Sequence, residues 1–267
     1  MRLKSMEKSS EGSDNGTHCL INAFHAGDDP LVRVSAEIPS SKETILIAGF
    51  PGSGLVGSIA VQYLVEALSF THIGNIASPL LPAVSLATAG LAQAPLRLYE
   101  KGRLLVVLSD VPVSDEGSCT IPSRILEWLC ARTVVTEIIL IGGVVTGGDG
   151  ERVFGVATTN EGIEKIKSSC QILPALNITG ITGGFLTEAC LRNIPATGFL
   201  VETNFDVDPR ASAAGLSVIS SIYGLALDTE PLIAQADSIE PMLQKLAEDV
   251  KKSDVPPTAF DEDIMYG

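Results

Sequence analysis

The stretch Thr44-Ile-Leu-Ile-Ala-Gly-Phe-Pro-Gly-Ser-Gly-Leu-Val-Gly-Ser58 decides the fold class of this chain. Its first half, Thr44 to Phe50, is a nearly continuous apolar run, which is typical of a strand that helices cover on both faces. Glycines follow, and Leu55 to Ser69 then has the composition of a helix. A buried strand, a glycine-rich turn and a helix together form the repeating unit of parallel α/β folds.

The same rhythm repeats along the chain. Further strands are predicted at Arg103 to Ser109, Glu137 to Gly142, Ala175 to Ile181 and Ala196 to Val201, with an edge strand at Leu31 to Ile38. Further helices are predicted at Pro122 to Arg132, Thr159 to Ser168, Gly184 to Asn193, Pro209 to Leu227 and Pro231 to Lys251. We interpret Gly147 to Gly150 as a hairpin turn. This alternation predicts an α/β fold, a three-layer α/β/α sandwich with a mostly parallel sheet.

The composition divides the chain into three parts. Residues 1–29 are rich in Ser, Gly, Asp and Lys and are predicted to form a flexible leader, whereas residues 30–250 form a single α/β domain. Residues 251–267 are predicted to form a flexible tail. Between Lys251 and Asp263 this tail holds two lysines, the Pro256-Pro257 pair and four acidic residues, too little apolar area to offset the entropy cost of ordering.

The net charge of −14 restricts the partners, because nucleic acid and anionic membranes would both repel the chain. No apolar run is long enough to span a bilayer, and Met1 to Asn15 does not resemble a signal peptide. The five cysteines, Cys19, Cys119, Cys130, Cys170 and Cys190, have no metal-binding spacing and are interpreted as reduced thiols. We therefore expect a cytoplasmic protein without metal or cofactor.

Gly49, Pro51, Gly52, Gly54 and Gly57 form the glycine loop of the opening stretch. Gly52, Gly54 and Gly57 have the G-x-G-x-x-G spacing of dinucleotide-binding turns, but the region Phe70 to Pro82 lacks the acidic residue that would hold a ribose. Ser58-Ile59 also replaces the lysine and hydroxyl pair of a phosphate-binding P-loop. We therefore predict that the loop is a structural turn; the alternative is an anion or nucleotide site in a nucleotide- or nucleoside-binding enzyme.

Other catalytic signals are weak. The histidines, His18, His25 and His72, form neither a metal pair nor a triad with a serine or cysteine. Ser109-Asp110, with Asp115 and Glu116 nearby, is the best candidate for a carboxylate cluster, although solvated loop acids and a helix cap explain these residues better. We therefore predict that the protein is not an enzyme.

The last three residues, Met265, Tyr266 and Gly267, resemble the hydrophobic-Tyr-X terminus by which proteasome activators and chaperones dock on the α-ring of the core proteasome. In such a terminus, the apolar side chain and the phenol ring supply buried area. The terminal carboxylate supplies a charge-assisted anchor. The three residues are therefore the predicted partner-binding site.

A second resemblance covers Ile38 to Glu248. Thr44 to Ala60 resembles the signature of the proteasome assembly chaperone 2 family in its archaeal form, and further segments follow in order. These are Tyr63 to Glu66, Ile73-Gly74, Ser78-Pro79, Pro95 to Tyr99, Leu108 to Pro112, Trp128, Ile138 to Gly143 and Gly180 to Gly184. The resemblance implies a fold similar to that of nucleoside phosphorylases, a homo-oligomer, and a role as assembly chaperone or ATP-independent activator of the proteasome.

Ala211 to Leu227 is a candidate for the contact between subunits. Gly215, Ser217, Ser221 and Gly224 are small and would permit close approach of a neighbouring helix. The alternative is that this helix packs on the sheet of its own chain.

Overall fold

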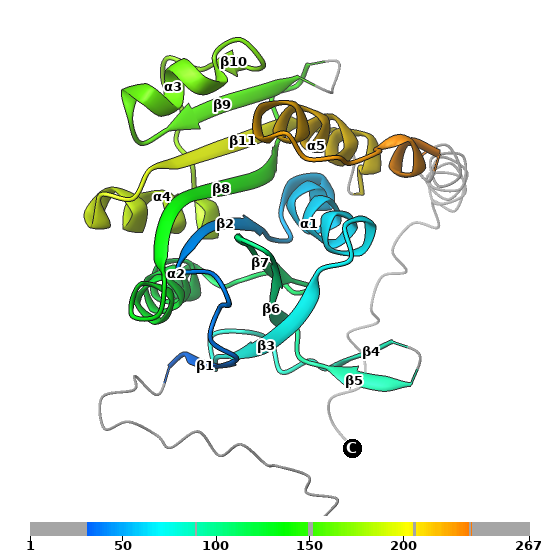
Figure 1. Cartoon of the computed structure of the whole chain (residues 1–267). Coiled ribbons are helices and arrows are strands. Elements are labelled where there is room, and N and C mark those ends of the chain that lie inside the picture. Colours follow the sequence, from blue (N-terminus) through cyan, green and yellow to red (C-terminus); the bar gives the residue numbers. More distant parts are fainter. Residues whose placement is uncertain (1–30, 89, 149–151, 205–206, 235, 237–267) are drawn as a thin grey trace, which may run out of the picture.

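The computed structural model describes residues 31–236 except 89, 149–151, 205–206 and 235. A large sheet runs through the middle of the domain (Figure 1). In spatial order its described strands are β1 (Arg33–Ala36), β3 (Thr71–Ala77), β6 (Leu96–Lys101), β7 (Leu104–Ser109), β2 (Glu43–Gly49), β8 (Val134–Val144), β11 (Ala196–Glu202), β9 (Val153–Ala157) and β10 (Gln171–Ile172). The edge position of β1 confirms the predicted edge strand.

The four central strands, β7, β2, β8 and β11, are parallel. Both β2 and β11 are buried along almost their whole length, as expected for strands with helices on both faces. On one side of this centre, β6 pairs antiparallel with β7, β3 with β6, and β1 with β3. On the other side, β9 runs antiparallel to β11. The predicted parallel arrangement therefore holds for the centre of the described sheet, whereas its flanks make the sheet mixed.

Helices cover both faces of the sheet (Figure 1). On one face lie α1 (Val56–Ala67), α3 (Asn160–Ile166) and α5 (Pro209–Tyr223), and on the other lie α2 (Asp115–Cys130) and α4 (Gly180–Arg192). The alternation along β2 divides the core accordingly: Leu46 and Ala48 belong to the α2–α4 side, and Ile45 and Ile47 to the α1–α5 side. The three-layer α/β/α arrangement is confirmed.

The start of α2 differs from the prediction. The helix begins at Asp115 rather than Pro122, because the hydroxyl of Ser114 accepts a hydrogen bond from the backbone N–H of Gly117 and caps the helix there. Asp115 and Glu116 occupy the first turn, where the helix dipole favours negative charge. Pro122 lies inside the helix.

Two other predictions are wrong. The strand predicted at Ala175 to Ile181 is absent, because residues 173–179 are irregular and α4 begins at Gly180, which has a φ of +65°. The hairpin predicted at Gly147 to Gly150 is also absent, since β11 lies between β8 and β9 in the described sheet. The strands β8 and β9 are therefore antiparallel but separated by β11, and are not the paired strands of a hairpin; Asp149 and Gly150 themselves lie outside the described residues.

Of the four small residues predicted to permit a contact between subunits, α5 buries only Gly215 against its own chain, whereas Ser217, Ser221 and Gly224 are exposed. A side chain at Gly215 would meet Ile141 and Val201 at 2.8 Å, so this glycine serves the contact with the sheet rather than contact with another helix. The helix ends at Gly224, whose φ of +66° forms a left-handed cap. Of the helix predicted at Pro231 to Lys251, residues 230–234 are helical, and the part beyond Ala236 lies outside the described residues.

A separate hairpin lies outside the large sheet. It consists of β4 (Leu86–Thr88) and β5 (Leu91–Gln93), which pair antiparallel only with each other in the described structure. Figure 1 shows this hairpin projecting from the domain on the side of β3. No helix among the described residues is long and apolar enough to cross a membrane.

Candidate functional site

The glycine loop follows β2 at the carboxyl end of the central strands. Gly143, near the end of β8, and Thr203, just beyond β11, lie against it. A side chain at Gly143 would approach the carbonyl oxygen of Ser53 to 2.0 Å, and one at Gly54 would approach the Thr203 hydroxyl to 2.5 Å. This edge is where open α/β sheets bind their ligands, so it is the first place to look for a site.

Gly49 and Gly57 bring β2, α1 and β8 close together. A Cβ atom at Gly49 would lie 2.2 Å from the carbonyl oxygen of Gly57. One at Gly57 would lie 2.6 Å from the carbonyl oxygen of Ile141 and 2.8 Å from that of Phe50. Because these neighbours are backbone atoms, no change of rotamer relieves the contact. Both glycines are therefore required by the approach of α1 to the sheet.

Gly54 and Leu55 both adopt left-handed conformations, with φ of +63° and +51°. For leucine this backbone is uncommon and costs free energy, so the surrounding contacts must hold it. The carbonyl oxygen of Gly54 accepts a hydrogen bond of 2.8 Å from the N–H of Asp208. The carboxylate of Asp208 in turn accepts hydrogen bonds from the Thr203 hydroxyl at 2.7 Å and from the N–H of Ala211 at 2.9 Å. The second of these bonds caps α5. The loop is thus fixed to the junction of β11 and α5.

Two amides at the end of the loop, those of Leu55 and Val56, are used within the chain. The N–H of Leu55 donates to the carbonyl of Gly52 at 2.9 Å, and the N–H of Val56 donates to that of Ser53. In phosphate-binding loops such amides point at the ligand. Among the glycines of the loop, only Gly52 has open space around it, with no atom within 4 Å of an added Cβ. This geometry supports the structural interpretation of the loop, which stays a prediction until the loop is altered.

An ion pair between the buried carboxylate of Glu202 and the exposed side chain of Arg152 lies at the same edge of the sheet. Glu202 has no exposed surface, and its carboxylate receives two hydrogen bonds from Arg152, at 2.9 Å from Nε and 2.6 Å from the terminal nitrogen. The hydroxyl of Thr146 donates to the same carboxylate. This two-point pairing is the strong form of the Arg–carboxylate contact and satisfies the buried charge within the chain. Sequence reasoning missed it, because Arg152 and Glu202 come from different strands.

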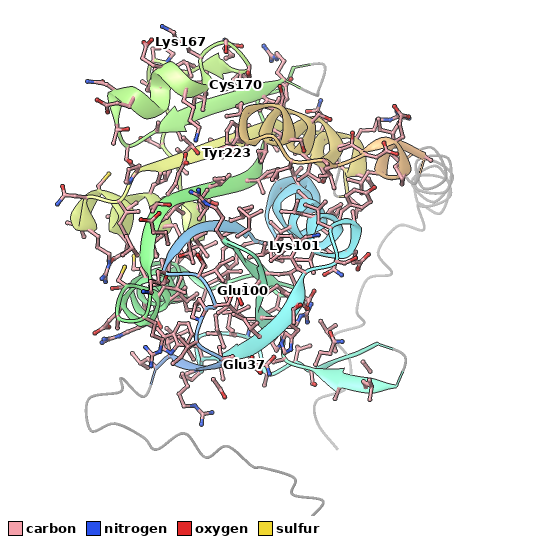
Figure 2. All side chains as sticks on the ribbon, viewed as in Figure 1. Glu37, Glu100, Lys101, Lys167, Cys170 and Tyr223 are labelled. Carbon is pink, nitrogen blue, oxygen red and sulfur yellow. The ribbon has the colours of Figure 1, made fainter. Side chains whose placement is uncertain are left out.

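A cavity of about 360 Å³ opens at the other, amino end of the central strands. Ile45, Ile47 and Ile139 form its apolar floor, and Glu137 and Tyr223 stand on its wall. Tyr223 is labelled in Figure 2; its hydroxyl donates to Glu137 at 2.6 Å and contacts the Thr197 hydroxyl at 2.8 Å. Burial, and then the hydrogen bond to Glu137, raise the pKa of Tyr223 well above the ordinary value of a tyrosine. The ring is therefore a neutral donor.

Lys165 completes this wall. Its ammonium group lies 2.8 Å from the Glu137 carboxylate and 3.9 Å from the centre of the Tyr223 ring. Lys165 on α3, Tyr223 on α5 and Glu137 on β8 therefore form one cluster, in which the Glu137 carboxylate joins the two helices to the strand. Each of its polar members has a partner within the chain, so its chemistry is that of a structural link. No residue of the glycine loop lines this cavity.

The carboxylate cluster predicted around Asp110 does not form a single site. Asp110 lies 2.5 Å from the buried guanidinium of Arg97, whereas Asp115 and Glu116 are exposed in the first turn of α2. The ring of His72 contacts Asn75 at 3.1 Å and packs edge-on to Tyr99. Within residues 31–236, apart from the gaps given above, no group of three or more His, Cys, Asp or Glu is placed to hold a metal. Met265, Tyr266 and Gly267 lie outside the described residues.

The fold and the loop together define a three-layer α/β protein with a tightly packed glycine turn after its first parallel strand. The model of the PAC2 family matches residues 46–247, and the chain belongs to this family.

Several relatives of this chain come from archaea. A protein of Methanocaldococcus jannaschii described as uncharacterized is 31% identical over 206 residues, which cover 76% of this chain and 85% of that protein. Pyrococcus furiosus PbaA, described as an archaeal homolog of proteasome-assembly chaperone, is 30% identical with a TM-score of 0.72, covering 82% of this chain and 93% of PbaA. PbaB of the same organism, described as an archaeal proteasome activator, is 25% identical with a TM-score of 0.72, covering 82% of this chain and all of PbaB. None of these matches tests the predicted similarity to nucleoside phosphorylases.

Proposed function

We propose that this protein is a non-enzymatic proteasome-binding protein, which acts as an assembly chaperone or as an ATP-independent activator of the core particle. The observation that carries the proposal is the match to PbaA and PbaB over 82% of this chain at a TM-score of 0.72. PbaA is described as a homolog of proteasome-assembly chaperone and PbaB as a proteasome activator, so the two matches support both alternatives. The packed glycine loop and the internally paired Glu202 and Asp110 agree with a role in binding rather than catalysis.

The contact with the core particle is assigned to the terminal residues of the chain. Met265 fills an apolar niche, Tyr266 contributes a ring whose burial costs little rotamer entropy, and the carboxylate of Gly267 pairs with a cation of the α-ring. The acidic stretch Asp261 to Asp263 affects the rate and salt dependence of association more than its specificity.

A homo-oligomer would present several of these tails at once. One short terminus binds weakly, whereas several joined to one body bind with the avidity set by their effective concentration. We place this activity in the cytoplasm, without nucleic acid, membrane or cofactor as partner.

Co-sedimentation with an archaeal core particle tests the proposal. Tyr266→Ala, and a chain that ends at Ile264, should both lose association, since truncating such an anchor costs about 2 kcal/mol or more per site, roughly thirtyfold in affinity. Phe260→Ala removes an aromatic ring from the same tail outside the motif and is the matched control, with unchanged binding expected. Melting temperature and oligomer mass should not change in any of these variants.

Equal binding by the tail variants and the wild type would refute the assignment to Met265, Tyr266 and Gly267. Two further assays separate the two roles. An activator accelerates peptide hydrolysis by the preassembled core particle, whereas an assembly chaperone raises the yield of rings from separate α subunits and leaves hydrolysis unchanged. Failure of both assays together with absent binding would refute the proposed function.

A further inference from the structure

Residues 67–96 contain no Asp, Glu, Lys or Arg, in a chain of which 19% is charged and whose net charge is −14. This uncharged stretch forms β3, the β4–β5 hairpin and the segments that join them to β6. Its part in β3 is paired in the large sheet, but most of the segment from Pro82 to Ala92 is exposed. Exposed segments of globular proteins are ordinarily polar and charged, so this composition requires an explanation.

We call Pro82–Thr88 and Gly90–Gln93 the arm. Its apolar side chains point outward: Leu91 is 71% exposed and Val84 is 45% exposed. The arm has three residues in each strand and no third strand among the described residues. A two-stranded ribbon of this kind is marginally stable in water and needs further strands or an apolar surface against it. Its free edges and exposed leucine make it an element that another surface should cover.

An apolar hollow adjoins the base of the arm. It has a volume of about 450 Å³, with Leu80, Leu81 and Pro82 on one side and Pro112 and Val113 on the other. Glu116 is the charged residue among those that line it. The hydroxyl of Ser114 donates to the carbonyl of Leu80 at 3.1 Å and holds the two sides together. A projecting apolar element and an apolar hollow therefore lie next to each other on one chain.

We propose that the arm and the hollow are the surface through which this chain associates with a second copy of itself. Two copies that each carry −14 repel one another wherever their charged surfaces meet. The arm has no charged residue and the hollow has only Glu116 among the residues that line it, so identical copies approach with little repulsion at this apolar surface. Each copy also supplies both an arm and a hollow, so a single interface between two copies covers the arm and the hollow of each. A second arm supplies the additional strands that the first arm lacks.

The absence of charge also argues against a foreign partner. A surface that selects a different protein ordinarily has charges that steer the partner and exclude wrong ones. The arm has no such charges and offers shape and apolar area alone, which suits a contact between copies. This inference specifies how the subunits of the proposed homo-oligomer meet. It does not depend on what the tails bind.

Sedimentation velocity of the full chain tests the inference. The wild type should sediment as a multiple of the 28.0 kDa subunit, and the double variant Val84→Asp/Leu91→Asp should sediment as a monomer. Both side chains are exposed, so the melting temperature of the monomer should stay close to that of the wild type. Leu191→Asp is the matched control: Leu191 on α4 is also 71% exposed but lies outside the arm, and its variant should keep the mass of the wild type.

Hydrogen exchange gives a second measurement on the wild type alone. The backbone amides of the arm should exchange more slowly in the concentrated protein than after dilution, because association covers them. A wild-type mass retained by the double variant, or equal exchange of the arm at both concentrations, would overturn the inference. It would also be overturned by a monomeric wild type whose binding to the core particle is lost in the double variant. That result would assign the arm to a foreign partner.

Discussion

Replacing Gly57 with alanine tests whether the glycine loop serves packing or ligand binding. The added methyl group would lie 2.6 Å from the carbonyl oxygen of Ile141, and 2.8 and 2.9 Å from the carbonyl oxygen and nitrogen of Phe50. All three are backbone atoms beside β2 and β8, so α1 must move away from the sheet. Overpacking of this kind costs about 1–3 kcal/mol, and alanine returns at most about 1 kcal/mol through its higher helix propensity.

We therefore expect Gly57→Ala to lower the free energy of unfolding by about 2 kcal/mol, since immobile backbone neighbours place the cost in the upper part of that range. For a domain of this size, that loss corresponds to a fall of roughly 4–8 °C in melting temperature. Differential scanning calorimetry measures it directly. Gly52→Ala is the matched control, because its Cβ meets nothing within 4 Å and its φ of −161° suits any residue. Its melting temperature should stay the same or rise slightly.

The same calorimetry tests the ligand interpretation. A ligand at a hundredfold its dissociation constant stabilises the native state by about 2.7 kcal/mol, which is easily seen. We expect no shift of the wild type with ATP, NAD or phosphate. Our reasoning would be refuted by a Gly57→Ala variant that melts with the wild type. It would equally be refuted by ligand stabilisation of the wild type that Gly52→Ala removes.

The remaining predictions concern the hydrogen bonds of Tyr223 to Glu137 and Thr197, and the metal content of the protein. Tyr223→Phe removes the hydroxyl between Glu137 and Thr197 and should lower the free energy of unfolding by about 1–2 kcal/mol at neutral pH, as measured by urea unfolding. The raised pKa of Tyr223 means that the native state keeps its proton when the unfolded chain loses it, so this contribution is complete below about pH 10 and declines above it. The difference between wild type and Tyr223→Phe should therefore narrow above about pH 10, and a constant difference would contradict the assignment. Elemental analysis after dialysis should find no stoichiometric metal, and one equivalent per subunit together with unfolding by a chelator would show this expectation to be wrong.

The elements that the sequence predicts well are those whose signals are local. The apolar run of β2, the helix α1 that follows the glycines, and the edge strand β1 all lie where the pattern places them. The start of α2 can also be read from the sequence, because Ser114 followed by Asp115 and Glu116 is the pattern of a helix cap, whereas the prediction began the helix at Pro122. Strand β9 was missed, since Gly155 interrupts a run of five residues whose partner in the described sheet, β11, is distant in sequence.

Long-range contacts explain the other features of the structure that the sequence does not predict. The spacing of Gly52, Gly54 and Gly57 predicts a tight turn, but the reasons for Gly54 and Gly57 lie in Thr203 and Ile141, which no local pattern connects to the loop. The lack of charge across residues 67–96 can be read from the sequence. That the hairpin within it is exposed, whereas β3 is paired, depends on the fold.

The order of the central strands also determines when this domain can fold during synthesis. Strand β8 pairs with β2, which leaves the ribosome early, and with β11, which leaves it late. A nascent chain that ends before Ala196 therefore presents β8 as an open, apolar edge strand. Such an edge pairs readily with other unfinished chains, so the interval before β11 emerges is the period of greatest aggregation risk. General nascent-chain chaperones are the factors that protect an edge of this kind at that stage.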